Sequence, residues 1–397
     1  MKRKIFAVAF SIAAGACLAL GLASCSKRGS VELVFKLNEE TDTYTAYIDH
    51  MGTTSGKLDI PAVYNDKPVT ALGYDSNYSY FEIEIKSIVL PDSVTEINAE
   101  VFERCGDVKK VSVSKDNPVY HSEGNCIIET ATDKLVFARK KSVIPDSVKS
   151  IGDYAFVDCS DLKSIALPNG VTSIGGYAFK DCDNLSSITL PSGVTSIGEF
   201  AFSSCYKLTN IKFPDSLASL GRHALEFCDI TDIKIPAATT SIGEQAFYTC
   251  RKVESITVAQ GNPVYDSAGN CLIEKATNTL IAGCKNSVIP DEVTAIGDYA
   301  FYACFGLGSI SIPAHVTTIG SSAFEGCLAL KKVEFGISVT RIQDNAFGDC
   351  DSLTAINYLG RTTDWKEIKK GERWRWRSHF LTSVVCSDGT LTEDEID

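Results

Sequence analysis

Fifteen cysteines are the residues of this 397-residue sequence with the widest chemical repertoire, since thiols can form disulfides, bind zinc or act as nucleophiles. Nine of them follow similar neighbours, as in VTSIGEFAFSSC, and successive members are 22, 23 or 54 residues apart. The nine are Cys105, Cys159, Cys182, Cys205, Cys228, Cys250, Cys304, Cys327 and Cys350. Because the spacing is regular, the repeated structural element determines the surroundings of each of these cysteines, and so what chemistry they can do.

If each step is one coil of a stacked fold, neighbouring cysteines have Cα atoms about 5 Å apart, a distance that a disulfide allows. Stacked side chains project in parallel, however, and parallel Cβ vectors suit that bridge poorly. Zinc is less favoured still, because the sequence has neither a C-x-x-C motif nor paired histidines. Reduced, buried thiols that fill small apolar sites are therefore favoured over bridges.

A cysteine nucleophile would need a partnered histidine, but the five histidines occupy unrelated positions of the repeat. These are His50, His121, His223, His315 and His379. The sequence also lacks G-x-S-x-G, phosphate-loop and H-E-x-x-H motifs. A catalytic residue is needed once, whereas these cysteines recur. We therefore expect a protein that is not an enzyme, with no cofactor and no metal.

The repeating element is a unit of about 23 residues with the pattern L-x-x-I-x-L-P-x-x-V-x-x-I-G-x-x-A-F-x-x-C. In one copy Ile188 and Leu190 alternate with polar residues, which indicates a short strand with one buried face, and Pro191 ends it. Gly198 is expected to supply a turn. One coil cannot bury its own apolar edge, but stacked coils can. The period predicts a β-rich leucine-rich repeat solenoid of roughly twelve coils, each a short parallel β-strand plus a turn or loop, capped at both ends.

Two units are longer than the rest, and each is interpreted as a coil with an inserted hairpin. They contain NPVYHSEGNCIIE from Asn117 and NPVYDSAGNCLIE from Asn262, 145 residues apart in similar surroundings, so a larger block was duplicated. We expect a linker and N-terminal cap hairpin over 25–57, the solenoid over 58–357, and a C-terminal cap with a short acidic tail over 358–397.

The strand side chains that face away from the core form the candidate binding ribbon. Most are small and polar, which suits an extended protein or glycan, and no aromatic stacking platform interrupts them. The charged and amide members are Asn210, Lys212, Asp232, Lys234, Lys332 and Glu334. The alternative is that these residues are merely compatible with solvent.

A second candidate site is the R-W-R-W-R segment near the C-terminus, which has aromatic and cationic residues in alternation. Its members are Arg373, Trp374, Arg375, Trp376 and Arg377. Such a strand could bind a sulphated glycan or another anionic surface by charge and cation–π contacts. The favoured alternative is a cap strand whose tryptophans cover the last coil while its arginines meet solvent.

Residues 1–24 have the pattern of a bacterial export signal, with Lys2, Arg3 and Lys4 before an apolar run and small residues at its end. The run ends in Leu-Ala-Ser-Cys, which resembles a lipobox and predicts lipidation of Cys25; an uncleaved membrane anchor or an ordinary signal peptide is the alternative. Loss of the three cations with this segment changes the formal net charge from −12 to −15. An acidic chain disfavours a nucleic-acid partner, and a lipid is the predicted attachment to the membrane.

The units, the NPVY-x-S-x-G-N insertions and the terminal YLG…DW…VVCSDG segment resemble the BspA-like leucine-rich repeat family of bacterial surface proteins. The resemblance covers about residues 58–390 and implies an exported adhesion or protein-binding module. It implies a host-matrix or neighbouring-cell protein as partner, and a location at the outer membrane or cell surface. Carbohydrate capture by a surface lipoprotein and a structural role in the envelope remain alternatives.

Overall fold

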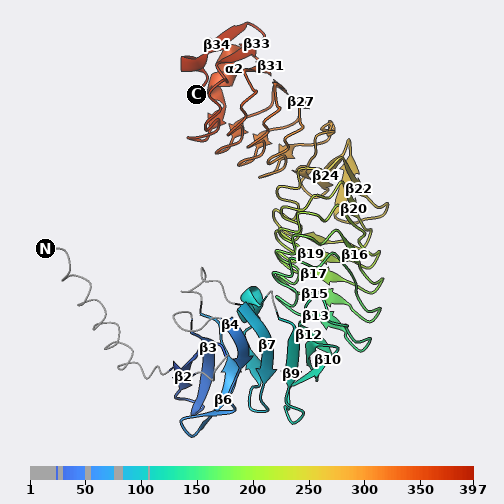
Figure 1. Cartoon of the computed structure of the whole chain (residues 1–397). Helices are drawn as coiled ribbons and strands as arrows, with labels where there is room; N and C mark the ends of the chain where they lie inside the picture. The colour runs from blue at the N-terminus through green and yellow to red at the C-terminus, as the bar shows by residue number, and fades with distance from the viewer. Residues whose placement is uncertain (1–23, 26–29, 50–54, 76–83, 106–107) are drawn as a thin grey trace, which may run out of the picture. The chain divides into compact units, whose positions relative to one another are not determined.

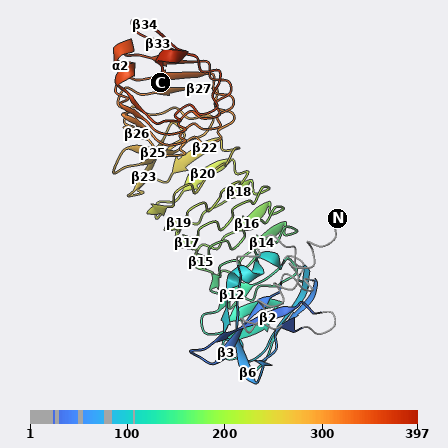
Figure 2. The ribbon, with the colours of Figure 1, turned by 90° about the vertical axis from the view of Figure 1, so that its left-hand side faces the viewer.

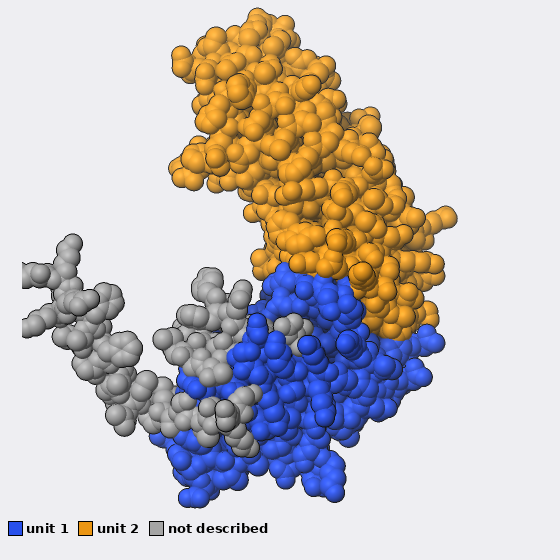
Figure 3. Space-filling view, viewed as in Figure 1, with its two compact units in different colours: residues 1–162, 168–182 blue, residues 163–167, 183–397 orange. Residues whose placement is uncertain are grey.

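The computed structural model describes residues 24–25, 30–49, 55–75, 84–105 and 108–397. They form a β-solenoid of about 13 turns, mostly strand with little helix (Figure 1), in agreement with the predicted fold. The chain divides into two compact units, residues 1–162 with 168–182 and residues 163–167 with 183–397 (Figure 3). Each unit has its own hydrophobic core, with Phe102 fully buried in the first and Phe324 in the second.

The first unit begins with the predicted hairpin, in which β2 and β3 pair in antiparallel fashion from Leu33–Ile48 to Asn38–Thr43. Its sheet follows the order β1-β2-β3-β6-β5, with β8 also paired to β6. The strands are β1 (Ser24–Cys25), β2 (Leu33–Asn38), β3 (Thr43–Ile48), β5 (Val63–Tyr64), β6 (Lys67–Leu72) and β8 (Glu96–Ile97). A 3₁₀ helix, η2 (Ala99–Arg104), follows β8.

Two further groups of strands complete the first unit. One is a parallel sheet of β4 (Ser55–Asp59), β7 (Glu84–Leu90) and β9 (Lys110–Val113). The other is β10 (Tyr120–Glu123), β11 (Cys126–Glu129), β12 (Lys134–Phe137), β13 (Ser150–Ile151) and β15 (Ser173–Ile174). β10 and β11 form the predicted inserted hairpin, and Gly124 and Asn125 make its turn at φ values of 55° and 64°. Two consecutive residues with positive φ are typical of a two-residue type I′ hairpin turn.

The second unit carries two kinds of parallel ladder on different sides of its turns (Figures 1 and 2). The predicted strand gives the first: β14 (Ser164–Ala166), β16 (Ser187–Thr189) and β18 (Asn210–Ile211); β20 (Asp232–Ile235) and β22 (Ser255–Val258); β27 (Ser309–Ile312), β29 (Lys332–Phe335) and β31 (Ala355–Tyr358). The second ladder was not predicted: β17 (Ser196–Ile197), β19 (Ser219–Leu220) and β21 (Ser241–Ile242); β26 (Ala295–Ile296), β28 (Thr318–Ile319) and β30 (Arg341–Ile342). β23 (Tyr265–Ala268), β24 (Cys271–Glu274) and β25 (Thr279–Ala282) form the second inserted hairpin and its return strand.

The segment after 357, predicted as a cap, adds one more strand to each ladder. β32 (Lys369–Lys370) pairs with β30, and β33 (Ser383–Cys386) pairs with β31 in parallel. β34 (Gly389–Thr392) then turns back against β33 in antiparallel fashion, which ends that ladder. The short helix α2 (Thr362–Glu367) and the 3₁₀ turn η3 (Glu393–Glu395) complete the segment.

The A-F-x-x-C phrase forms a turn that hydrogen-bonds to the next turn in the stack. In the second unit, the N–H groups of Ser322, Phe324 and Gly326 donate to the carbonyls of Asp344, Ala346 and Gly348, at 2.8–2.9 Å. The alternate N–H groups bond within the turn, as Cys327 N does to Phe324 O at 3.1 Å. This arrangement places the residue before the alanine and the residue before the cysteine at positive φ, as at Ser322 and Gly326. The turns therefore form a third set of contacts between coils.

The phenylalanine of the phrase stacks from turn to turn inside each unit. Ring centroids are 4.9 Å apart for Phe156 and Phe179 in the first unit. In the second unit they are 5.0 Å apart both for Phe301 with Phe324 and for Phe324 with Phe347. Such near-parallel rings form continuous columns along runs of consecutive turns, as the repeat predicted.

The glycine of the phrase has a different role from the predicted turn. A Cβ at Gly221 would lie 2.4 Å from Glu199 N and 2.4 Å from Gly198 C of the preceding turn. The same collision recurs at Gly243 and Gly320, where the nearest backbone nitrogen would be 2.3 Å and 2.6 Å away. The glycine therefore avoids a collision where consecutive backbones approach closely, although Gln343 occupies the same position in one unit.

We expect Gly221→Ala to lower the free energy of unfolding by about 2 kcal/mol, because the added methyl group must push two backbones apart. Gly308→Ala is the matched control, since its Cβ would have no atom within 4 Å. Chemical denaturation of both variants measures the difference. Equal stability of the two variants would contradict the close-approach explanation.

Candidate functional site

The candidate ribbon lies on the first kind of ladder of the second unit and is largely open to solvent. Asn210 and Lys212 at β18, Asp232 and Lys234 in β20, and Lys332 in β29 are exposed. Glu334, also in β29, is half-buried. The apolar residues between them, such as Ile233 and Val333, are buried at 2% and 0% exposure. The backbone that presents these polar side chains is thus anchored in the core.

The ribbon residues lie on strands that belong to three assigned sheets along the ladder. Asn210 belongs to the sheet β14-β16-β18, Asp232 to the pair β20-β22, and Lys332 to the sheet that begins at β27. In two of these groups, neighbouring polar side chains are linked across strands. Asp232 accepts a short hydrogen bond from Ser255, which together with Thr231 lowers the pKa of its carboxyl group. Ser311 similarly donates to Glu334 at 3.3 Å.

The R-W-R-W-R segment forms a turn, so its prediction as a strand with all tryptophans on one face was wrong. Phe347 N donates to Trp374 O at 2.7 Å, just as Phe324 N donates to Ala346 O at 2.8 Å. The segment is therefore a diverged A-F-x-x-C turn in which Trp374 takes the place of the alanine. Trp374 is buried at 2% exposure, whereas Trp376 is 46% exposed.

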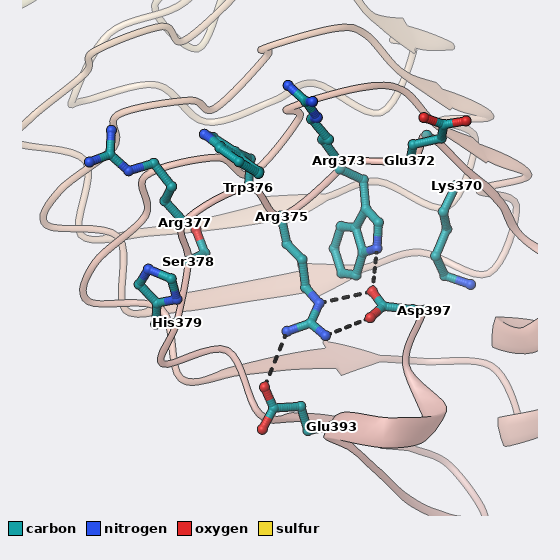
Figure 4. A pocket seen from close by; sticks show the side chains of 12 residues that line it. Lys370, Glu372, Arg373, Arg375, Trp376, Arg377, Ser378, His379, Glu393 and Asp397 are labelled. Carbon is teal, nitrogen blue, oxygen red and sulfur yellow. Dashed lines mark hydrogen bonds and ion pairs between the residues drawn. The ribbon is translucent and has the colours of Figure 1, made fainter.

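Arg375 of this segment is already engaged by Asp397 and Glu393 (Figure 4). Arg375 pairs with Asp397 at 2.6 Å, and a hydrogen bond from Arg375 is the largest cause of the lowered pKa of Asp397. Arg377 lies 3.5 Å from Asp349, and the Arg373 guanidinium lies 4.8 Å from the Trp376 ring centroid. These groups line a hollow of about 700 Å³, but its cations are partly neutralised. An anionic ligand would have to compete with the chain's own carboxylates.

The thirteen described cysteines are free thiols, eleven of them buried. In the A-F-x-x-C turns the thiol donates to the carbonyl of the preceding turn, from Cys327 Sγ to Phe301 O and from Cys350 Sγ to Phe324 O at 3.2 Å each. Burial raises the pKa of Cys304 and of Cys350 to about 12, so these thiols stay protonated at neutral pH. A protonated thiol is a poor nucleophile and a poor metal ligand.

Ser378 shows that the hydrogen bond to the preceding turn is kept where serine replaces the cysteine. It follows the R-W-R-W-R turn at the position of the repeat cysteine, and its hydroxyl donates to Phe347 O at 2.5 Å. Among the described residues, no group of three His, Cys, Asp or Glu side chains is placed to hold a metal ion.

A cavity of about 500 Å³ lies in the second unit where the second long block interrupts the A-F-x-x-C turns. Its lining includes Phe247, Tyr248, Ala282, Cys284 and Tyr302. The repeat pattern did not predict this cavity. The signal was present in the differences between the two duplicated blocks, which were compared only for their similarity.

Of the predicted export segment, residues 1–24, residues 1–23 lie outside the described residues. The backbone of Cys25 is described in β1, where it pairs with Leu33 of β2. Among the described residues, no helix is both long and apolar enough to cross a membrane.

Comparison with known proteins identifies the repeat. The sequence model of the BspA type leucine rich repeat region matches in six copies, over residues 75–137, 137–254 and 280–369. No match is found among curated proteins.

Solved structures of bacterial leucine-rich repeat proteins are similar along nearly the whole chain. A leucine-rich cell surface protein of Faecalibacterium prausnitzii is 25% identical with a TM-score of 0.54, over 94% of this chain and 96% of that one. A leucine-rich repeat protein of Eubacterium ventriosum is 20% identical with a TM-score of 0.48, over 92% and 86% of the two chains. One of Bacteroides ovatus is 24% identical with a TM-score of 0.43, over 89% and 92%.

We expect Cys327→Ser to retain more stability than Cys327→Ala, because a hydroxyl can keep the bond to Phe301 O as Ser378 does with Phe347 O. Alanine leaves a buried carbonyl without this donor and opens a small cavity. Together these two effects are expected to lower the free energy of unfolding by about 2 kcal/mol. The midpoints of thermal unfolding show which of the two variants is more stable. If alanine is the less harmful substitution, the thiol acts only as an apolar filler.

Proposed function

We propose, because the chain belongs to the BspA type leucine-rich repeat family, that it is a non-catalytic protein-binding module displayed outside the cytoplasm. The observation that carries this proposal is the set of exposed polar side chains on strands whose alternate residues are buried, as in the D-I-K-I pattern of β20. A surface held this way is ordered before the partner arrives. Binding then avoids the entropic cost of ordering a loop, which commonly weakens association.

A protein is favoured over a glycan as the ligand of the ribbon. Sugar-binding surfaces typically offer an aromatic ring for stacking, and the rows around Asn210, Asp232 and Lys332 carry none. The side chains there are short hydroxyls and amides beside isolated charges of both signs. This composition suits an extended polypeptide that makes several hydrogen bonds and ion pairs at once.

Attachment through a lipid on Cys25 is part of the same proposal. Residues 1–24 would act as the export signal, 25–57 as linker and cap hairpin, 58–357 as the solenoid, and 358–397 as the closing cap. The similar protein of Faecalibacterium prausnitzii is described as a cell surface protein, which supports display at the outer membrane or cell surface. The partner would then be a host-matrix protein or a protein on a neighbouring cell.

The proposal is tested with the double variant Lys212→Glu and Lys234→Glu, which reverses the charge of two exposed ribbon positions. Immobilised matrix proteins and intact neighbouring cells serve as targets. We expect binding by the unaltered protein, and a loss of about tenfold in affinity for the variant, because charge reversal at a contact adds repulsion.

The matched control is Arg341→Glu with Lys369→Glu, two exposed cations on the second ladder that give the same change in charge. It should bind as the unaltered protein does. Equal losses in both variants would mean that net charge, rather than the ribbon, drives binding. Full protection of the protein when intact cells are treated with protease would contradict surface display.

A further inference from the structure

The two long blocks are copies of one structure, which allows them to be compared position by position. In the first block Asn117 Nδ2 donates to Pro91 O at 2.7 Å and to Val94 O at 2.8 Å. In the second, Asn262 Nδ2 donates to Pro236 O and Thr239 O, both at 2.8 Å. A residue of the first block therefore corresponds to the residue 145 positions later.

In the first block, an arginine and a phenylalanine fill the interior beside η2. The Phe137 ring lies 4.5 Å from Phe102, and the Arg139 guanidinium lies 4.3 Å from the Phe137 ring centroid. Arg139 Nε donates to Cys105 O at 2.8 Å, and one terminal nitrogen donates to Phe102 O at 3.0 Å. Arg139 is only 3% exposed, so the turn carbonyls satisfy a buried cation.

In the second block both of these side chains are missing. Ala282 stands in the place of Phe137, and Cys284 in the place of Arg139. The Cys284 thiol makes its contacts elsewhere, with Glu254 O at 3.6 Å and Asn270 O at 3.9 Å. Phe247, which corresponds to the fully buried Phe102, is consequently half-buried, and the cavity of about 500 Å³ occupies the space.

The turn that binds the arginine in the first block is preserved in the second. Cys250 N donates to Phe247 O at 3.1 Å, as Cys105 N does to Phe102 O at 3.0 Å. The carbonyls of Phe247 and Cys250 thus correspond to the two acceptors of Arg139. The two arginines that line the cavity are engaged with other rings, Arg251 with Phe305 at 4.4 Å and Arg222 with Phe200 at 6.0 Å.

Other groups around the cavity favour the same kind of ligand. Tyr248 and Tyr302 stack with their ring centroids 4.4 Å apart, and their faces offer cation–π contacts. Glu274 and Asp298 supply negative charge to the lining. Thr249 also lines the cavity and is 5% exposed, and its hydroxyl has no hydrogen-bond partner among the described residues. An unpartnered polar group in such a place gains from a ligand that donates or accepts a hydrogen bond.

We infer that this cavity binds the guanidinium group of an arginine on a partner protein, which there takes the place that Arg139 fills within the first block. The inference rests on the proposed protein-binding function and adds an anchoring site distinct from the ribbon. A buried arginine that enters a preformed pocket is a common source of binding energy in protein interfaces. The two blocks thus differ at two side chains, which fill the interior in the first block and leave room for a ligand in the second.

The test uses N-acetyl-arginine amide as the probe, with the lysine and citrulline analogues as controls, in calorimetry and ligand-observed NMR. We expect saturable binding of the arginine probe at least about tenfold tighter than of either control, because citrulline lacks the charge and lysine lacks the planar donor array. Absence of arginine binding to folded protein, or equal binding of the three probes, would overturn the inference.

The location is tested with Ala282→Phe and Cys284→Arg together, which restore the filling of the first block. This variant should lose arginine binding while its thermal midpoint is unchanged or higher. Cys284→Arg alone provides the same test if the double variant does not fold. Retained binding in a folded filled variant would overturn the assignment of the cavity.

The ribbon variant Lys212→Glu with Lys234→Glu separates this inference from the proposed function. It should bind the arginine probe as the unaltered protein does, because its substitutions lie outside the cavity lining. Loss of probe binding in that variant would place the site on the ribbon. Target binding without probe binding would overturn the cavity assignment alone and leave the ribbon proposal standing.

Discussion

The structure depends on the hydrogen bonds by which alternate N–H groups of most A-F-x-x-C turns reach the carbonyls of the next turn. These bonds, such as Phe324 N to Ala346 O at 2.8 Å, hold successive backbones at a fixed separation. That separation explains the glycine of the phrase, because Gly221 and Gly320 face a backbone too close for a Cβ. It also brings phenylalanine rings such as Phe301 and Phe324 to stacking distance, and thiols such as that of Cys327 to a carbonyl of the preceding turn. The residues conserved from unit to unit are therefore those that this spacing requires.

The period and the apolar alternation in the sequence were sufficient to predict the solenoid, its first ladder, both inserted hairpins and the N-terminal hairpin. The second ladder was missed because each of its strands, such as β17 and β19, contains only two residues, too few to show alternation. The role of the glycine was mistaken because a sequence does not reveal how closely two backbones approach.

The candidate sites were harder to predict, since they depend on where the repeat departs from its own pattern. R-W-R-W-R alternates like a strand, yet the hydrogen bond from Phe347 N to Trp374 O places it in a turn. The ribbon residues were expected at outward-facing strand positions; five of the six are exposed, whereas Glu334 is half-buried, and Lys212 follows the end of β18. The cavity depends on two substitutions, Ala282 and Cys284, whose effect becomes visible only when the buried Arg139 is seen.

The protein combines a regular stacked backbone with surface residues that differ from coil to coil. Stacking fixes the backbone from its interior, which leaves outward-facing residues such as Lys212 and Lys234 free to vary without loss of the fold. The two duplicated blocks show the same freedom in the interior, because one keeps its arginine and the other has a cavity in its place. A family with one repeat can in this way present different binding surfaces.

Hydrogen–deuterium exchange of the turn amides tests the central claim most directly. The N–H groups of Ser322, Phe324 and Gly326 lie in a segment without regular strand or helix, and amides of exposed turns exchange quickly. The account predicts that these three amides are protected as strongly as those of the flanking strand β29. Exchange at the rate of an unstructured loop would show that the turns do not hold the coils together.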